Sequence, residues 1–445
     1  MDIDKVDSKI TGKDVYIAIL DTGLTSYWKE FIPEDRIQWG WVRHFHDLAM
    51  DFEVENGYYP DWGGWDSIIE SRDIVASNEE YLDEGHHGTK LISYITGWFY
   101  NDPYTGNYYF FKGIAPGAKI IPIKVYTAYQ VDDGIWTEFC NDYTMASGIK
   151  YITELAEKHP NKRFIIEISS GWQNEIIGET IIPWYEMCPE IIGAVYDAID
   201  AGVVVVASAG NNGFNYGGYR GMVYPAALDE VISAGASFWL DNEWVPYELN
   251  DDGTAKSYNP LWFMNDVPED NPELGLDNGD YSGVSQLCSR ALIEIDDPND
   301  PQGYQELDVF VPSGFAVGPG KLPGGPDPYS MYYYDDTLHY VGATSGAAPQ
   351  LAGIIALMLQ ANPDLSVSEV ETILKESADE IAPWYFGYYF IPPYPLPGYF
   401  YGGMLPTVWG ILPFPFPPEY QDIGLDLGSG LAQADSAVEM AKSYI

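Results

Sequence analysis

Short, almost uninterrupted runs of apolar and β-branched residues recur along this chain, separated by stretches with helical spacing. The run VVVVA at residues 203–207 is the clearest, and VYIAIL at 15–20 and RFIIEIS at 163–169 have the same character. Strands with apolar side chains on both faces need cover on both faces, which is the arrangement of a parallel sheet between two helical layers. The chain is therefore predicted to form an α/β fold with a mostly parallel central sheet.

Other segments continue this alternation. Further strands are expected within residues 113–126 and at 231–236, and helices at 142–158, 190–202 and 366–380, the last with Ser366 or Ser368 as its N-cap. Helical spacing also begins at Gly88 and after Gly346, and it returns near the C-terminus.

Acidic residues dominate the charge of the chain. There are 67 Asp and Glu against 21 Lys and Arg, which gives a formal net charge of −46. Phosphate groups are bound by clustered Lys and Arg, so this balance excludes nucleic acid as a partner. Salt or low pH relieves the self-repulsion of such a surface, and the abundance of Tyr, Trp and Ile favours acid or heat tolerance over salt.

Three cysteines, Cys140, Cys188 and Cys288, are widely separated and show no CxxC spacing. This pattern argues against a zinc site and against a disulfide-rich scaffold. Buried free thiols are expected, with one disulfide plus a free thiol as the alternative. No run of about 18 consecutive apolar residues is present, so no membrane span is expected.

Asp21, His87 and Ser345 each stand next to glycine or threonine, at the end of an apolar strand or the start of a helix. A serine hydroxyl is a poor nucleophile unless an imidazole takes its proton, and the imidazole needs a carboxylate to fix its tautomer. These residues thus have the composition of a nucleophilic triad. Asn211, in a glycine-flanked loop after the strand at 203–207, is a suitable side-chain donor to an oxyanion.

The order Asp, His, Ser and the flanking residues resemble the subtilisin-like serine proteases (subtilases, peptidase family S8). LDTG at 20–23 matches the family's aspartate motif, HGT at 87–89 its histidine motif, and ATSGAAPQLAG at 343–353 its serine motif. SAGNNG at 208–213 resembles the loop that carries the oxyanion asparagine. The resemblance extends over about residues 13–440.

The resemblance implies a subtilisin-like three-layer fold and a serine endopeptidase that works through an acyl-enzyme. In this scheme Ser345 attacks the scissile carbonyl, His87 transfers the proton and Asp21 orients His87. Asn211 and the Ser345 amide would stabilise the oxyanion. The substrate-binding residues implied by the family are Ser169, Ser170, Gly171, Ala209 and Gly210.

Departures from the family pattern occur close to these residues. Lys90 replaces the second histidine of the usual HGTH, and Ala343 replaces a glycine before the nucleophile. Glu167 stands where asparagine is more usual, and a carboxyl there is expected to favour low pH, where it is neutral. His86 is interpreted as a neighbour that tunes His87 or meets Asp83 or Glu84 in solvent.

We expect one catalytic domain over residues 1–445, with insertions at about 45–82, 241–308 and 383–419. Residues from about 24 to 82 show no regular pattern, and 100–112 are expected to form an exposed, tyrosine-rich hairpin or loop. The insertion at 383–419 is rich in aromatic residues and proline, whose density excludes helix and central strand.

The chemistry is expected to need no cofactor, while the acidic insertion at 241–308 is equally compatible with a structural Ca²⁺ ion and with a solvated surface. His44 and His46 flank Phe45 at strand-like alternation; hydrogen-bonded histidines are favoured there over a metal site. The first residues lack the apolar run of a signal peptide, and an extracellular or cell-surface mature form is favoured over a cytoplasmic protein.

Two other functions stay open. The first is a subtilase-fold binding or structural protein with vestigial catalysis, which would assemble with itself or with a cell-surface partner through 383–419. The second is a serine-carboxyl peptidase of similar fold, which would need Glu in place of His87 and Asp in place of Asn211.

Overall fold

The computed structural model describes most of the chain, and the statements below concern these residues: 1–76, 86–101, 108–132, 135–172, 175–177, 180–182, 188–210, 222–239, 281–282, 307–312, 317–319, 333–335, 338–340, 343–379, 387–391, 410–414 and 428–444. Asn211 and Cys288 lie outside the described residues, as do most of the insertions at 241–308 and 383–419.

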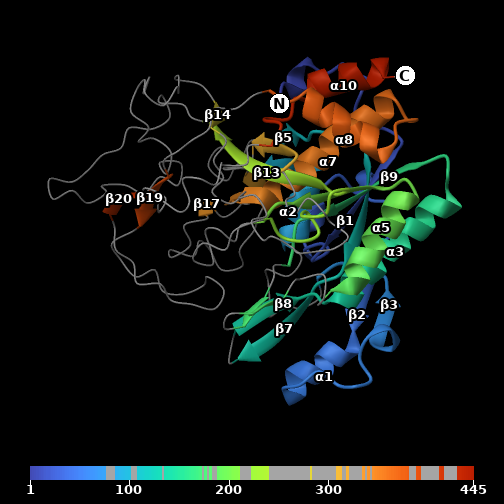
Figure 1. The fold of residues 1–445 in the computed structure, drawn as a ribbon, viewed down its shortest axis with the longest axis vertical. Helices are drawn as coiled ribbons and strands as arrows, with labels where there is room; N and C mark the ends of the chain where they lie inside the picture. Colours follow the sequence, from blue (N-terminus) through green and yellow to red (C-terminus); the bar gives the residue numbers. More distant parts are fainter. Residues whose placement is uncertain are drawn as a thin grey trace.

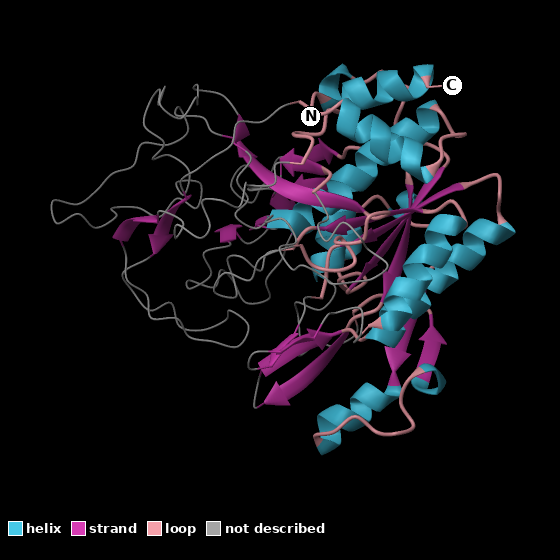
Figure 2. Ribbon diagram, in the orientation of Figure 1, coloured by secondary structure: helices cyan, strands magenta, loops and turns pink. Residues whose placement is uncertain are grey.

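A mostly parallel sheet runs through the centre of the molecule (Figures 1 and 2). Its order is β14-β13-β12-β9-β1-β6-β2-β3, and β15 also pairs with β13. The strands are β1 (Val15–Asp21), β2 (Arg43–Asp47), β3 (Ile68–Ser71), β6 (Lys119–Lys124), β9 (Arg163–Ile168), β12 (Val204–Ser208), β13 (Ile232–Trp239), β14 (Tyr281–Ser282) and β15 (Val309–Pro312). Only the β2–β3 and β13–β14 pairs within this described sheet are antiparallel. The prediction of a mostly parallel sheet is confirmed.

Helices cover both faces of this sheet, because its strands alternate between two apolar cores. Ile17 and Ile19 of β1 face a core shared with α2 (His86–Thr96) and α7 (Ala343–Ala361). Ala18 and Leu20 face the opposite core, shared with α3 (Asp142–Lys158) and α5 (Pro189–Asp200). Figure 1 shows α3 and α5 lying side by side, away from α7. Burying one such aliphatic side chain contributes about 1.5–3 kcal/mol, so the two cores fix the layers.

The remaining regular elements are shorter. The helices are α1 (Leu48–Asn56), α8 (Val367–Glu376) and α10 (Ala434–Ser443), and the 3-10 turns are Ile3–Lys5, Trp28–Glu30, Glu34–Arg36 and Trp65–Ser67. Small antiparallel sheets are formed by β4 (Gly97–Asn101) with β5 (Tyr108–Lys112), β7 (Thr127–Asp132) with β8 (Ile135–Phe139), β10 (Glu175–Ile177) with β11 (Thr180–Ile182), β16 (Val317–Pro319) with β18 (Leu338–Tyr340) and β17 (Tyr333–Asp335), and β19 (Gly387–Ile391) with β20 (Gly410–Phe414).

The region from about 24 to 82 is more regular than its sequence indicates. β2 pairs with β6 in parallel, β3 pairs with β2, and α1 connects them, with the Asp47 side chain accepting from the Ala49 amide as N-cap. The expectation of an irregular segment is therefore wrong here. β2 and β3 lie at one end of the sheet and contain few apolar residues, Phe45 in β2 and Ile68 and Ile69 in β3, so they lack the continuous apolar run of the central strands.

Two of the cysteines are free thiols, as predicted. Cys188 is buried, and burial raises the pKa of Cys140 to about 12. Among the helices in the described ranges, none combines the length and the apolar character needed to cross a bilayer.

Candidate active site

Asp21 and His87 form a hydrogen-bonded pair at the carboxyl end of β1. The Asp21 side chain is 2% exposed, and its oxygens lie 2.9 and 3.0 Å from His87 Nδ1. The Thr22 amide donates to the same carboxylate at 2.8 Å. The carboxylate accepts a hydrogen bond from the protonated Nδ1. Nε2 of the imidazole is therefore left without a proton and can take one from another group. The His87 side chain is 35% exposed, so its ring reaches the surface.

The start of α2 is held very close to the loop after β1. The Gly88 amide donates to Thr22 Oγ1 at 3.0 Å, and the Thr25 amide donates to Thr89 Oγ1 at 3.0 Å. A Cβ at Gly88 would lie 2.5 Å from the Gly23 carbonyl oxygen and 3.2 Å from Asp21 Oδ1. Glycine at position 88 is therefore required for His87 to reach Asp21.

His86 has a different role from its neighbour. Its side chain is only 3% exposed, its Nε2 lies 2.7 Å from Tyr27 Oη, and the two rings meet edge to face at 5.8 Å. Successive helical residues point about 100° apart, so a His87 that faces Asp21 turns His86 into the core. The interpretation of His86 as a residue that meets solvent is wrong; Asp83 and Glu84 lie outside the described residues.

Ser345 lies in the first turn of α7 and is tied to the end of β9. Ser345 Oγ donates to the Ser169 carbonyl at 3.2 Å, and Ser169 Oγ donates to the Ser345 carbonyl at 3.0 Å. Next to it, the Gly210 amide donates to Thr344 Oγ1 at 3.2 Å. The carboxyl ends of β1, β9 and β12 thus meet the first turns of α2 and α7, which is the edge where ligands bind in α/β sheets.

The segments predicted to bind substrate lie beside each other. A Cβ at Gly171 would lie 2.2 Å from Val223 Cγ2, and Trp172 and Tyr224 exchange backbone bonds of 2.9 and 2.8 Å. Gly171 is exposed and Ser170 half-buried.

The backbone of Ala209 is already bonded within the protein, to Ala234 and to Val223, both at 3.0 Å. Substrate contacts by Ala209 and Gly210 stay predictions, as does the oxyanion role of Asn211, which lies outside the described residues.

Glu167, which the sequence singled out as a carboxyl group in place of the usual asparagine, lies beneath this site. It is fully buried in β9, and its Oε1 is hydrogen-bonded to Ser169 Oγ. Burial raises the pKa of Glu167 well above its ordinary value; the Ser169 hydrogen bond lowers it and the charge of Asp21 raises it. The only sign of this role in the sequence was a glutamate in place of the usual asparagine. The contact between Glu167 and Ser169 could not be predicted, because it forms only in the folded chain.

The histidines of β2 are engaged in hydrogen bonds, as favoured from the sequence. His46 Nδ1 lies 3.0 Å from Thr127 Oγ1 and its Nε2 lies 2.8 Å from Asp51 Oδ2. Burial, and then the charge of Lys124, lower the pKa of His44 to about 3. Within the described ranges no three His, Cys, Asp or Glu side chains gather as a metal site would require. The Ca²⁺ hypothesis for 241–308 stays a prediction.

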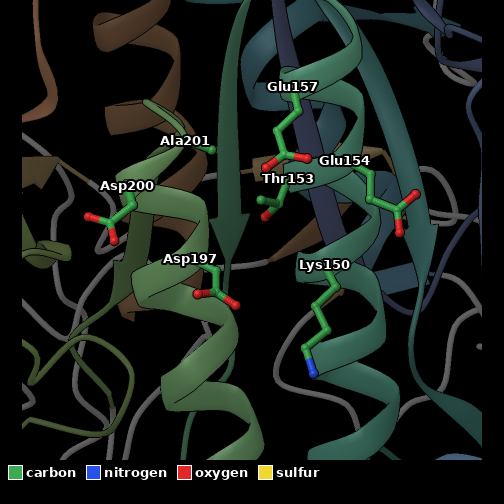
Figure 3. A pocket seen from close by; sticks show the side chains of 7 residues that line it. All are labelled: Lys150, Thr153, Glu154, Glu157, Asp197, Asp200 and Ala201. Carbon is green, nitrogen blue, oxygen red and sulfur yellow. The ribbon is translucent and has the colours of Figure 1, made fainter.

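A separate surface pocket lies between α3 and α5 (Figure 3). It is lined mainly by carboxylates, from Glu154 and Glu157 on α3 and from Asp197 and Asp200 on α5. These helices cover the face of the sheet opposite to α2 and α7. The pocket therefore does not belong to the site of Asp21, His87 and Ser345.

Comparison with known families agrees with this geometry. The model of the Subtilase family (Peptidase_S8) matches residues 12–388. The chain belongs to the subtilase family.

Curated relatives of this subtilase include the serine protease AprX of Bacillus subtilis, 25% identical over 74% of the chain and 60% of AprX. The Major intracellular serine protease of Bacillus subtilis is 28% identical over 51% of the chain and 52% of that protein. The chain thus spans about half to three fifths of the length of these relatives. Among solved structures, Sphericase has 18% identity and a TM-score of 0.48, with 83% of this chain and 84% of that chain covered.

Proposed function

We propose that this subtilase is a serine endopeptidase whose catalytic triad is Asp21, His87 and Ser345. The observation that carries the proposal is the buried Asp21 carboxylate with both oxygens within 3.0 Å of His87 Nδ1. A carboxylate in this position fixes the tautomer that accepts a proton at Nε2, and it stabilises the imidazolium that follows. Ser345, in the first turn of the adjacent α7, supplies the nucleophile.

The reaction would proceed in two halves. Ser345 Oγ exchanges the Ser169 carbonyl for His87 Nε2 as its acceptor, passes its proton there and attacks the scissile carbonyl carbon. The negative oxygen that forms is stabilised by the Ser345 amide and the Asn211 side chain. Collapse releases the amine, which takes the proton from His87, and leaves an ester on Ser345. Water then attacks that ester, with His87 again as base, and the carboxylic acid product leaves.

The test is the hydrolysis of casein by a Ser345→Ala variant. We expect the rate to fall by about 10⁴-fold or more, since removal of one triad member removes nucleophilic catalysis. Ser368→Ala is the matched control, because Ser368 is an exposed serine of α8. Unchanged hydrolysis by Ser345→Ala would refute the triad. A wild-type protein that is folded but inert would instead favour the binding or structural role through 383–419.

Cellular location stays part of the proposal. Relatives include both the Major intracellular serine protease and the Aeromonas extracellular serine protease of Aeromonas sobria, so these relatives do not decide between compartments. We favour an extracellular or cell-surface enzyme that acts on protein or peptide substrates, and heat or acid tolerance as the reason for its composition.

A further inference from the structure

Glu167 is a carboxyl group in an apolar environment. It pairs in register with Ile19 of β1 and Val206 of β12, and both of these side chains belong to the core beneath α2 and α7. The Glu167 side chain is fully buried, and its Oε2 has no hydrogen-bond partner among the described residues. A carboxylate anion in such a place is strongly disfavoured unless a cation neutralises it.

The carbonyl group of Ser345 is bonded to the Cα atom that carries the nucleophilic side chain. This carbonyl needs a hydrogen-bond donor from outside its helix. In an α-helix it would accept from the amide four residues ahead, but that residue is Pro349, which has no N–H. Ser169 Oγ takes the place of the missing donor at 3.0 Å, while Ser345 Oγ donates to the Ser169 carbonyl. This reciprocal pair anchors the first turn of α7 to the end of β9.

The number of hydrogen atoms available in this network determines whether the carboxyl group of Glu167 is protonated. Ser169 Oγ is within hydrogen-bonding distance of the Ser345 carbonyl and of Glu167 Oε1, but a hydroxyl carries a single hydrogen. The carbonyl can only accept. If Ser169 donates to it, the proton between Ser169 and Glu167 must belong to the carboxyl group. The burial that raises the pKa of Glu167 agrees with this protonated form.

We propose that Glu167 is a positioning residue whose neutral carboxyl group donates to Ser169 Oγ and thereby keeps the Ser169 hydroxyl directed at the Ser345 carbonyl. Loss of the carboxyl proton would turn the Ser169 hydroxyl toward the carboxylate, because charge-assisted hydrogen bonds are the stronger ones. The Ser345 carbonyl would then lose its donor and the nucleophile its anchor. The inference rests on the proposed function for its catalytic consequence, which is a loss of activity as the pH rises.

The groups that face Glu167 support this direction of pH dependence. Among the described residues, Asp21 of β1 is the charged group that acts on Glu167, and its negative charge opposes ionisation of Glu167. β12 contributes Val206 in register, and α7 contributes the Ser345 carbonyl through Ser169. A folded-state pKa above the unfolded value means that the unfolded chain loses this proton first. Stability therefore falls as the pH rises above the ordinary glutamate pKa, until the folded-state pKa is passed.

The first arm of the test measures stability without hydrolysis. Ser345→Ala keeps the carbonyl and removes the nucleophile, so it serves as the parent for Glu167→Gln. Glutamine is neutral at all pH values and its amide can donate to Ser169 Oγ. Relative to Glu167→Gln, the unfolding equilibrium constant of the parent should rise by up to about tenfold per pH unit above about pH 4.5. If the free energy of unfolding, measured with denaturant, depends on pH in the same way in the two proteins, the inference is overturned.

The second arm measures kcat and KM against pH in the active enzyme. Glu167→Gln should keep its kcat at the higher pH values at which the kcat of the wild type declines, with KM unchanged. Glu167→Leu, which has the same volume class but no donor, should lose about tenfold in kcat at every pH, as expected for one lost hydrogen bond. In a variant that already carries Ser169→Ala, adding Glu167→Gln should not change the dependence of kcat on pH any further. An unchanged decline of kcat with rising pH in Glu167→Gln, or equal impairment in the Gln and Leu variants, would contradict the proposal.

The two arms separate this inference from the proposed function. A wild type that does not hydrolyse peptides refutes the endopeptidase, yet the stability arm still decides whether Glu167 is protonated. A wild type that hydrolyses peptides but shows no effect of Glu167→Gln on its pH profile refutes the positioning role alone.

Discussion

Replacing Gly88 with alanine should separate His87 from Asp21 while every proposed catalytic side chain stays in the chain. The new Cβ would lie 2.5 Å from the Gly23 carbonyl oxygen, whereas ordinary contacts begin at 3.4 Å. The obstacle is backbone and cannot rotate away, so the start of α2 must retreat by about 0.9 Å. That shift lengthens the contacts of 2.9 and 3.0 Å between His87 Nδ1 and Asp21 beyond a good hydrogen bond.

A misplacement of about 1 Å costs about 10²-fold in rate, so kcat/KM for a peptide substrate should fall by about that factor in Gly88→Ala. Overpacking should also destabilise the protein by about 1–3 kcal/mol, measured by denaturant unfolding.

Gly193→Ala is the matched control. Gly193 lies in α5, and a Cβ there meets nothing within 4 Å. It should leave kcat/KM unchanged and stabilise the protein by up to about 1 kcal/mol. Activity of Gly88→Ala within about threefold of the wild type would refute the claim that this close approach positions His87.

Four further substitutions test other contacts by kinetics and denaturant unfolding. His86→Ala should cost about 2 kcal/mol of stability through the lost bond to Tyr27 but spare most of kcat, whereas His87→Ala should lower kcat by about 10⁴-fold; equal losses of kcat would mean that the wrong histidine was assigned. Lys375→Ala should destabilise the protein by about 2–3 kcal/mol, because it removes the ammonium 2.6 Å from the buried Asp308 carboxylate; a neutral effect would contradict this. Ser366→Ala should cost about 1 kcal/mol, since Ser366 caps α8 in a capping box; unchanged stability would show that the cap is dispensable.

The central sheet could be predicted because its strands are buried on both faces. β9 and β12 are nearly continuous apolar runs, and the helix expected at 142–158 has those bounds in the structure. The pairing of Asp21 with His87 was implied by short motifs, because glycine at a close approach leaves a recognisable sequence. The place of β2 and β3 in the sheet was missed, because strands at the end of a sheet need no continuous apolar run; only the strand-like alternation around Phe45 pointed to β2.

Contacts between distant segments could not be predicted in the same way. Glu167 looked unusual in the sequence, but its role depends on Ser169, which faces Ser345 across 176 positions in the chain. The histidine pair is similar: the HGT motif selected His87, but the contact of His86 with Tyr27 was not predictable, because it depends on the direction of α2 in the folded chain.

A fluorophosphonate probe, followed by mass mapping of the labelled peptide, tests the triad most directly, because such a probe reacts with an activated serine and not with an ordinary hydroxyl. The folded wild type should carry the label on Ser345, the reaction should be strongly slowed in His87→Ala and Asp21→Asn, and Ser345→Ala should stay unlabelled. Label on another residue, or a folded wild type that does not react, would contradict a triad of Asp21, His87 and Ser345.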